Sequence, residues 1–158
     1  MSRNDGQDET PGDERVKGTA ALLVNARGEY LLHLRDDVPG ICDPGTWSLI
    51  GGNRKAGESP EETIRRELME EAGLSIPGLQ RFTVARSLGP DGTTKGHINV
   101  FRGRWDGDAA ALPVTEGIMF HWFAAAVVPR LRMSPWARSV IELDSGVTRR
   151  RFASQEPS

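Results

Sequence analysis

Residues 52–74 constrain the fold of this chain more than any other stretch, because they encode a helix together with both of its ends. They read GNRKAGESPEETIRRELMEEAGL. Ser59 is a favourable N-cap, and Glu62, three residues later, completes a capping box. Pro60 suits the first helical position. Gly73 readily adopts the left-handed conformation that ends a helix, so the sequence predicts a helix between the cap and this glycine.

The predicted helix carries two different faces. One face is acidic, because three carboxylates stand at positions i, i+3 and i+4: Glu67, Glu70 and Glu71. The neighbouring face is apolar, with one residue every four positions: Ile64, Leu68 and Ala72. We expect the apolar face to pack on a core, which holds the carboxylates together beside it.

Carboxylates this close repel one another, and the repulsion grows when they are partly buried. Oxygen ligands without a neighbouring His or Cys favour a hard divalent cation such as Mg²⁺ or Mn²⁺. A solvated acidic helix surface is the alternative interpretation. Glu58, Arg66 and the flanking glycines fall in register with the acidic face, and this register favours the metal site.

The fixed points of residues 52–74 follow the pattern G-x5-E-x7-R-E-U-x-E-E-x-G-U, where U is aliphatic. This pattern resembles the Nudix box, the signature of the Nudix hydrolases, and every defined position matches. The resemblance implies an α/β fold, namely an α/β/α sandwich with a mixed β-sheet and flanking helices. It also implies a Mg²⁺-dependent hydrolase, with Mn²⁺ as a substitute. Such an enzyme uses metal-activated water to cleave the pyrophosphate linkage of a nucleoside triphosphate, nucleotide sugar or ADP-ribose type of substrate.

The resemblance also implies roles for individual residues. The metal ligands would be acidic side chains and the carbonyl groups of the glycine pair: Glu67, Glu70, Glu71, Glu116, Gly51 and Gly52. The same glutamates and Arg66 would be the catalytic residues. The attacking water needs a base, and either Glu67 or Glu116 could serve. We expect Arg66 to orient a catalytic glutamate or to pair with Glu58 rather than to touch the substrate.

Candidates for substrate contacts lie outside the acidic face: Arg35, Trp47, Arg54 and His97. Each has an ordinary alternative. Arg35 could form a surface ion pair, and Trp47 could be a core tryptophan. Arg54 could contribute only diffuse electrostatic steering. For His97 the alternative is a satisfied or exposed histidine.

The rest of the chain predicts strands on both sides of the helix: 17–25, 30–35, 47–50, 81–88, 97–105 and 118–123. A second helix is predicted over about 134–143. This order indicates a mixed sheet with helices on its faces. The expected organisation is a disordered N-terminal segment, one Nudix hydrolase domain and a flexible C-terminal tail: 1–15, 16–146 and 147–158.

The net charge of −2 argues against a general nucleic-acid-binding protein. The single cysteine, Cys42, excludes an internal disulfide and suits a reducing cytoplasm. The chain has neither a long apolar run nor a signal peptide. We therefore expect a cytoplasmic protein with a nucleotide-type small-molecule substrate, no membrane contact and no stable nucleic-acid partner. A homodimer is left open.

Two other functions remain as alternatives. A noncatalytic nucleotide-binding or sensor module on the same fold would be expected to lose one or more of the glutamates in the Nudix box, whereas this chain keeps them all. A structural domain with an incidental acidic helix would bind no metal.

Overall fold

The computed structural model describes the backbone of residues 16–155 and the side chains of residues 16–146. The expected N-terminal segment, residues 1–15, lies outside the described residues, as do residues 156–158 of the expected tail. The strands are β1 (Gly18–Val24), β2 (Tyr30–Leu34), β3 (Trp47–Ser48), β4 (Ile50–Asn53), β5 (Gln80–Leu88), β6 (Thr94–Arg104) and β7 (Met119–Phe123). The α-helices are α1 (Pro60–Ala72) and α2 (Pro135–Gln155), and short 3₁₀ helices are η3 (Ala109–Ala111) and η4 (Val128–Arg130).

The strands form one mixed sheet of seven strands. β1 lies at its centre and pairs parallel with β6. The first half of β1 also pairs antiparallel with β4, whereas β2 pairs antiparallel with β3 and β7. β5 pairs antiparallel with β6 at the end of the strand order. The mixed sheet predicted from the sequence is therefore confirmed.

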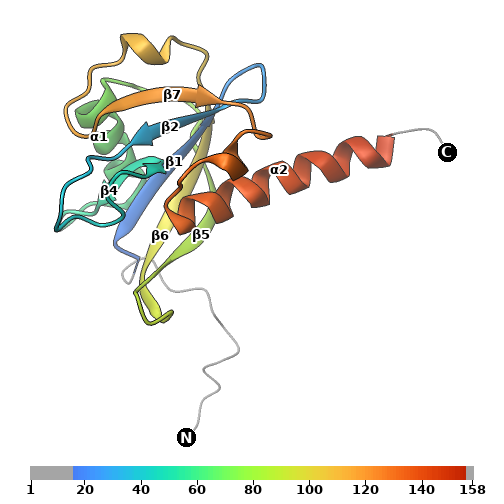
Figure 1. The fold of residues 1–158 in the computed structure, drawn as a ribbon. Helices are drawn as coiled ribbons and strands as arrows, with labels where there is room; N and C mark the ends of the chain where they lie inside the picture. Colours follow the sequence, from blue (N-terminus) through green and yellow to red (C-terminus); the bar gives the residue numbers. More distant parts are fainter. Residues whose placement is uncertain (1–15, 156–158) are drawn as a thin grey trace, which may run out of the picture.

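Each face of the sheet is covered by one helix (Figure 1). Along β1, Ala20 and Leu22 point to a core that includes residues of α2, whereas Ala21 and Leu23 point to a core that includes residues of α1. Because successive side chains of a strand alternate between its faces, a strand buried on both sides reads as a continuous apolar run. The predicted α/β/α sandwich is confirmed.

Two elements differ from the sequence-based expectation. The single strand expected over 47–50 is two strands, β3 and β4. β4 continues through the glycine pair to Asn53. Glycine carries no side chain that could report an apolar alternation, so the sequence pattern did not extend the strand this far. Helix α2 is also longer than expected and reaches Gln155, into residues assigned to the tail.

The helices among the described residues do not combine the length and apolarity that crossing a membrane requires.

Candidate active site on the acidic face of α1

The ends and the orientation of α1 match the capping signals in the sequence. The Ser59 hydroxyl accepts a hydrogen bond from the Glu62 backbone N–H at 3.1 Å, and the Glu62 carboxylate accepts one from the Ser59 N–H at 2.8 Å. Gly73 ends the helix in the left-handed region, with φ of 64°. The apolar stripe is buried in the core on the α1 side of the sheet: Ile64, Leu68 and Ala72. The acidic face is thereby held at a defined angle to the sheet.

Arg66 connects the carboxylates of this face. Its guanidinium donates to both carboxylate oxygens of Glu58, at 2.6 and 2.9 Å. It also donates to Glu67 at 3.2 Å, to Glu70 at 3.1 Å and to the backbone carbonyl of Asn53 at 3.1 Å. The two hydrogen bonds from Arg66 to Glu58, followed by the one from the Lys55 backbone N–H, hold the pKa of Glu58 at about 2. Arg66 therefore ties the start of the helix, its middle and the end of β4 into one unit.

The glycine pair of β4 lets this strand lie close to both α1 and the central strand β1. A Cβ atom at Gly52 would overlap the carboxylate of Glu67, and one at Gly51 would overlap the backbone of β1 at Thr19. The Gly52 carbonyl accepts a hydrogen bond from the Thr19 hydroxyl at 2.9 Å. The Glu67 carboxylate thus lies directly against the backbone of Gly52, where only glycine leaves room for it.

Glu71 is the buried member of the acidic group, with 6% of its surface exposed. Burial raises its pKa to about 9, assisted by a hydrogen bond with Glu67 and by the negative charges of Glu67 and Glu116. The positive charge of Arg35 acts in the opposite direction. Glu67, Glu116 and Arg35 therefore all lie within electrostatic reach of one buried carboxyl group.

Glu116 reaches the acidic face because its loop is fastened on both sides. The Thr115 hydroxyl donates to the Glu70 carbonyl at 3.1 Å, and Ile118 N–H donates to the Leu34 carbonyl at 2.8 Å. Between them, the His33 Nε2 bonds to the Glu116 carbonyl at 2.8 Å. These contacts place the loop between the end of β2 and the second half of α1.

His33 is a further residue of the candidate site, and no motif in the sequence marks it as one. It is buried, and its ring stacks on Phe120 with 4.6 Å between ring centroids. Burial lowers its pKa, so the neutral imidazole donates its Nε2 proton to the Glu116 carbonyl. A Cβ atom at Gly117 would overlap the His33 ring. The Glu116-Gly117 dipeptide before β7 is a local sequence feature at this contact, but it does not indicate that His33 of β2 is the partner.

The donor atoms of this site fit a hard divalent cation. Carboxylate and carbonyl oxygens are the ligands that such ions prefer, and a cation would compensate the repulsion between Glu67 and Glu71. In the side-chain positions of this structure, residues 16–146 contain no group of three or more His, Cys, Asp or Glu arranged to hold a metal ion. Arg66 holds part of the acidic group, because its guanidinium donates to both Glu67 and Glu70.

The four candidate substrate contacts lie in different surroundings. Arg35 lies close enough to influence Glu71 and donates to the Cys42 carbonyl at 2.9 Å. Arg54 holds the loop before α1 by donating to the Glu58 carbonyl at 3.0 and 3.1 Å. Trp47 packs on the core of the α2 side, edge-on to Phe123. Trp47 therefore has the environment of a core tryptophan.

His97, the fourth candidate, lines a cavity at the end of the sheet where β1 begins. Asn53, the last residue of β4, lines the same cavity. The structure thus groups Arg35 with the glutamates and places His97 in a neighbouring cavity.

Comparison with known proteins identifies the domain. The family described as NUDIX domain matches residues 14–143. An RNA pyrophosphohydrolase of Gluconacetobacter diazotrophicus is 42% identical over 60 residues, which cover 36% of this chain and 36% of the relative. The nucleoside triphosphatase NudI of Escherichia coli is 45% identical over 62 residues, 39% of this chain and 43% of the relative. The chain therefore spans less than half the length of these curated relatives.

Solved structures share the fold along most of the chain. The NUDIX domain of Shewanella oneidensis NrtR, crystallised with ADP ribose, superposes with a TM-score of 0.69 at 16% identity and covers 92% of this chain and 94% of its own. The MutT NUDIX hydrolase from Burkholderia pseudomallei gives a TM-score of 0.68 at 24% identity and covers 81% and 95%.

Proposed function

The chain belongs to the Nudix hydrolase family, and on this premise we propose that it is a Mg²⁺-dependent pyrophosphohydrolase. Its substrate would be a nucleoside diphosphate derivative, and water would cleave the pyrophosphate linkage. The observation that carries this proposal is the placement of the glutamates: Glu67 lies against Gly52, and Glu71 is buried beside Glu67. Two carboxyl groups in this position are costly for a fold that binds no cation.

Each residue of the site has a role in this proposal. The ion would be held by glutamates and by backbone carbonyls of the glycine pair: Glu67, Glu70, Glu71, Glu116, Gly51 and Gly52. When bound, Mg²⁺ or Mn²⁺ neutralises phosphate charge and activates water. Arg66 orients Glu67 and Glu70 through its hydrogen bonds. Arg35, whose charge acts on Glu71, would meet a phosphate of the substrate.

Glu67 and Glu116 were equal candidates for the base that takes the proton of the attacking water. The surroundings of the two now favour Glu116. Glu67 is engaged by Arg66 and packs against Gly52, whereas Glu116 is exposed on a loop fastened by its backbone carbonyl. A base must be free to reach the proton that it takes.

The relatives narrow the chemistry of the substrate. One is named an RNA pyrophosphohydrolase and one a nucleoside triphosphatase, and one structural neighbour was crystallised with ADP ribose. A nucleoside that carries at least two linked phosphates is common to all three. A cytoplasmic setting, where such nucleotides are abundant, agrees with the single cysteine, Cys42.

A comparison of Glu67→Gln with the parent protein tests this proposal. Both proteins are incubated with Mg²⁺ and a panel of nucleoside triphosphates, nucleotide sugars and ADP ribose, and released phosphate and nucleotide are measured. We expect turnover to fall by at least about a hundredfold in the variant, as on removal of a group that stabilises transition-state charge. Glu142→Gln, an exposed substitution in α2, is the matched control.

The outcomes separate the functions that remain. Equal turnover in the parent and in Glu67→Gln would contradict the role of the glutamates. Binding of nucleotides without hydrolysis of any panel member would favour a sensor module. A calorimetric titration that shows no binding of Mn²⁺ to the parent would contradict the proposed metal site.

A further inference from the structure

Asn99, in β6, is buried with 4% of its surface exposed, and its amide nitrogen has no hydrogen-bond partner within the described part of the chain. Among the fully buried side-chain nitrogen and oxygen atoms of residues 16–146, this nitrogen alone is unpaired. A buried donor without an acceptor destabilises a fold, and native proteins rarely keep one without a functional reason. The Asn99 amide is therefore expected to act on a neighbouring polar group.

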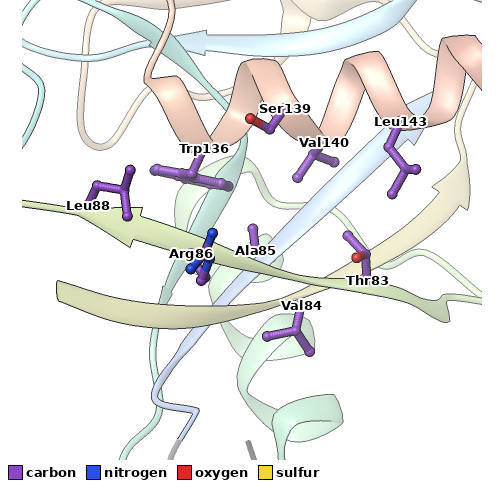
Figure 2. A pocket seen from close by; sticks show the side chains of 9 residues that line it. All are labelled: Thr83, Val84, Ala85, Arg86, Leu88, Trp136, Ser139, Val140 and Leu143. Carbon is purple, nitrogen blue, oxygen red and sulfur yellow. The ribbon is translucent and has the colours of Figure 1, made fainter. Parts of the chain in front are cut away.

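The side chain of Asn99 points to the α1 side of the sheet. Asn99 pairs with Val84 of β5, and directly paired residues of neighbouring strands share a face. Figure 2 shows the cavity between α2 and β5, where Ala85 points toward α2 and Val84 points away from it. The residues on either side of Asn99, Ile98 and Val100, pack in the core on the α2 side. Both observations place the Asn99 amide on the face that α1 covers.

On this face, Asn99 lies in one row with residues of the proposed metal site. It pairs with Thr19 of β1, and Thr19 pairs in turn with Gly52 of β4. Neighbouring strands are about 4.8 Å apart, so each member of the row is one strand spacing from the next. The Glu67 carboxylate of α1 lies against Gly52 at the end of the row. The row therefore leads from the unpaired amide to the glutamates.

Thr19 is the nearest polar neighbour of the Asn99 amide. Four residues adjoin Asn99 on this face, two across the strands and two along β6: Thr19, Val84, His97 and Phe101. Val84 and Phe101 carry no side-chain oxygen or nitrogen. A residue two positions along a strand lies about 7 Å away, which is farther than one strand spacing. Thr19 is therefore closer than His97.

The Thr19 hydroxyl already bonds to the proposed metal site. It donates its single proton to the Gly52 carbonyl at 2.9 Å, so its oxygen can still accept a hydrogen bond. A hydroxyl group can rotate about its C–O bond and lose such a donation. A donor that occupies its oxygen fixes the rotation, and it also strengthens the next bond of the chain.

We propose that Asn99 is a positioning residue that acts through Thr19 on the Gly52 carbonyl. A rotation of the Asn99 side chain lets its amide donate to the Thr19 hydroxyl oxygen, and the Thr19 proton is thereby directed to Gly52. The Gly52 carbonyl is then held in the orientation in which it binds the cation beside Glu67. The inference rests on the proposed function for the cation, whereas the hydrogen-bond chain belongs to the metal-free fold.

Thermal melts in EDTA test the hydrogen-bond chain without metal or substrate. Asn99→Leu replaces the amide by an apolar group of similar size. In the parent it removes a hydrogen bond, whereas in Thr19→Val it removes an amide that has lost its acceptor. The melting temperature is therefore expected to respond to Asn99→Leu less favourably in the parent, by at least about 3 °C. Equal responses in the two backgrounds would overturn the inference, and so would a coupling with His97→Leu in place of Thr19→Val.

Calorimetry with Mn²⁺ tests the action on the proposed metal site. The dissociation constant for Mn²⁺ is expected to rise about fivefold in Asn99→Leu and in Thr19→Val, the usual effect of losing one neutral hydrogen bond. It is expected to rise no further in the double variant, because both substitutions break the same chain. Val84→Ala, which changes the packing beside Asn99 on the same face, is the matched control. This control is expected to lower the melting temperature and to keep the parental affinity for Mn²⁺.

The outcomes separate this inference from the proposed function. If the parent binds Mn²⁺ and hydrolyses a nucleotide, but Asn99→Leu binds Mn²⁺ as tightly as the parent, Asn99 is purely structural and the inference is wrong. If the parent binds no Mn²⁺, the proposed function fails, and with it the action of Asn99 on the cation. Coupling between Asn99→Leu and Thr19→Val in EDTA would still support the donation from Asn99 to Thr19.

Discussion

At the scale of single residues, Arg66 and Glu71 show how the fold organises negative charge. The Arg66 guanidinium donates hydrogen bonds to three carboxylates and a backbone carbonyl. Its bonds to Glu58 stabilise that carboxylate as an anion. Glu71 is buried beside Glu67, and burial is the main reason why its pKa is raised. Glu58, just before α1, and Glu71, near its end, therefore differ sharply in their affinity for protons.

The Glu58 carboxylate makes the free energy of unfolding depend on pH. Its pKa in the folded protein, about 2, lies below the ordinary value of 4.5. The pair with Arg66 therefore stabilises the fold fully above about pH 4.5, and this stabilisation is lost as the pH falls toward 2. We expect Glu58→Gln to lower the melting temperature at pH 7, and the deficit to shrink between pH 4.5 and 2. Circular dichroism melts across this range measure it, and a constant deficit would contradict the prediction.

Glu71→Gln separates folding from metal binding. The amide of glutamine is neutral and can still donate to Glu67, so the metal-free variant is expected to melt no lower than the parent. Turnover with Mg²⁺ is expected to fall at least about a hundredfold, because one ligand for the ion is lost. Calorimetry with Mn²⁺ should show weaker binding. A variant that keeps full turnover would contradict the assignment of Glu71.

At the scale of elements, β4 determines where α1 meets the sheet. Ala20 and Thr19 of β1 pair with Gly51 and Gly52, respectively. The strand is short, but its two glycines lie close against both neighbours, Gly51 against the backbone of β1 and Gly52 against the Glu67 side chain of α1. The acidic face is therefore positioned by two contacts, the apolar stripe of α1 on the sheet and the glycine pair under Glu67.

The two glycines are expected to respond differently to alanine. In Gly51→Ala the new Cβ would meet the backbone of β1, which cannot move aside, so the melting temperature should fall strongly. In Gly52→Ala it would meet the end of the Glu67 side chain, which can rotate away. We therefore expect Gly52→Ala to lower kcat more strongly than it lowers the melting temperature. Gly89→Ala, whose nearest contact would lie at an ordinary 3.5 Å, is the control.

At the scale of the whole molecule, the sheet separates the side that carries the proposed active site from the side covered by α2. α2 is joined to the sheet by a buried polar contact, in which the Tyr30 hydroxyl donates to Asp144 at 2.6 Å. Arg102 donates to the other Asp144 oxygen at 2.7 Å. Burial, followed by the hydrogen bond and charge of Asp144, raises the pKa of Tyr30 to about 12. Tyr30 packs with the α2 core, on the face opposite to α1.

Tyr30→Phe is therefore expected to weaken the fold without changing the chemistry. It removes one donor to a buried carboxylate, which costs about 1–3 kcal/mol of unfolding free energy. Urea denaturation should show a lower midpoint, while kcat and KM stay at parental values. A change in kcat at unchanged stability would show that the two sides of the sheet are coupled.

The sequence by itself determined the helix from its cap at Ser59 to Gly73, the sharing of one face by Glu67, Glu70 and Glu71, and the family. These features depend on residues a few positions apart, whose geometry follows from the helical repeat. The strands flanking α1 were also predictable in order, because their apolar runs are local.

Only the tertiary structure decided how β4 pairs with β1, how deeply Glu71 is buried, and which residue fastens Glu116. The bond from His33 to the Glu116 carbonyl spans 83 positions of sequence, and the cavity beside Asn53 gathers residues that range from Lys17 to Trp136. Such contacts form only when the sheet brings remote segments together, and no local pattern encodes their partners. The Nudix box therefore identifies the family and supports the proposed type of reaction, whereas the substrate depends on surfaces assembled by the fold.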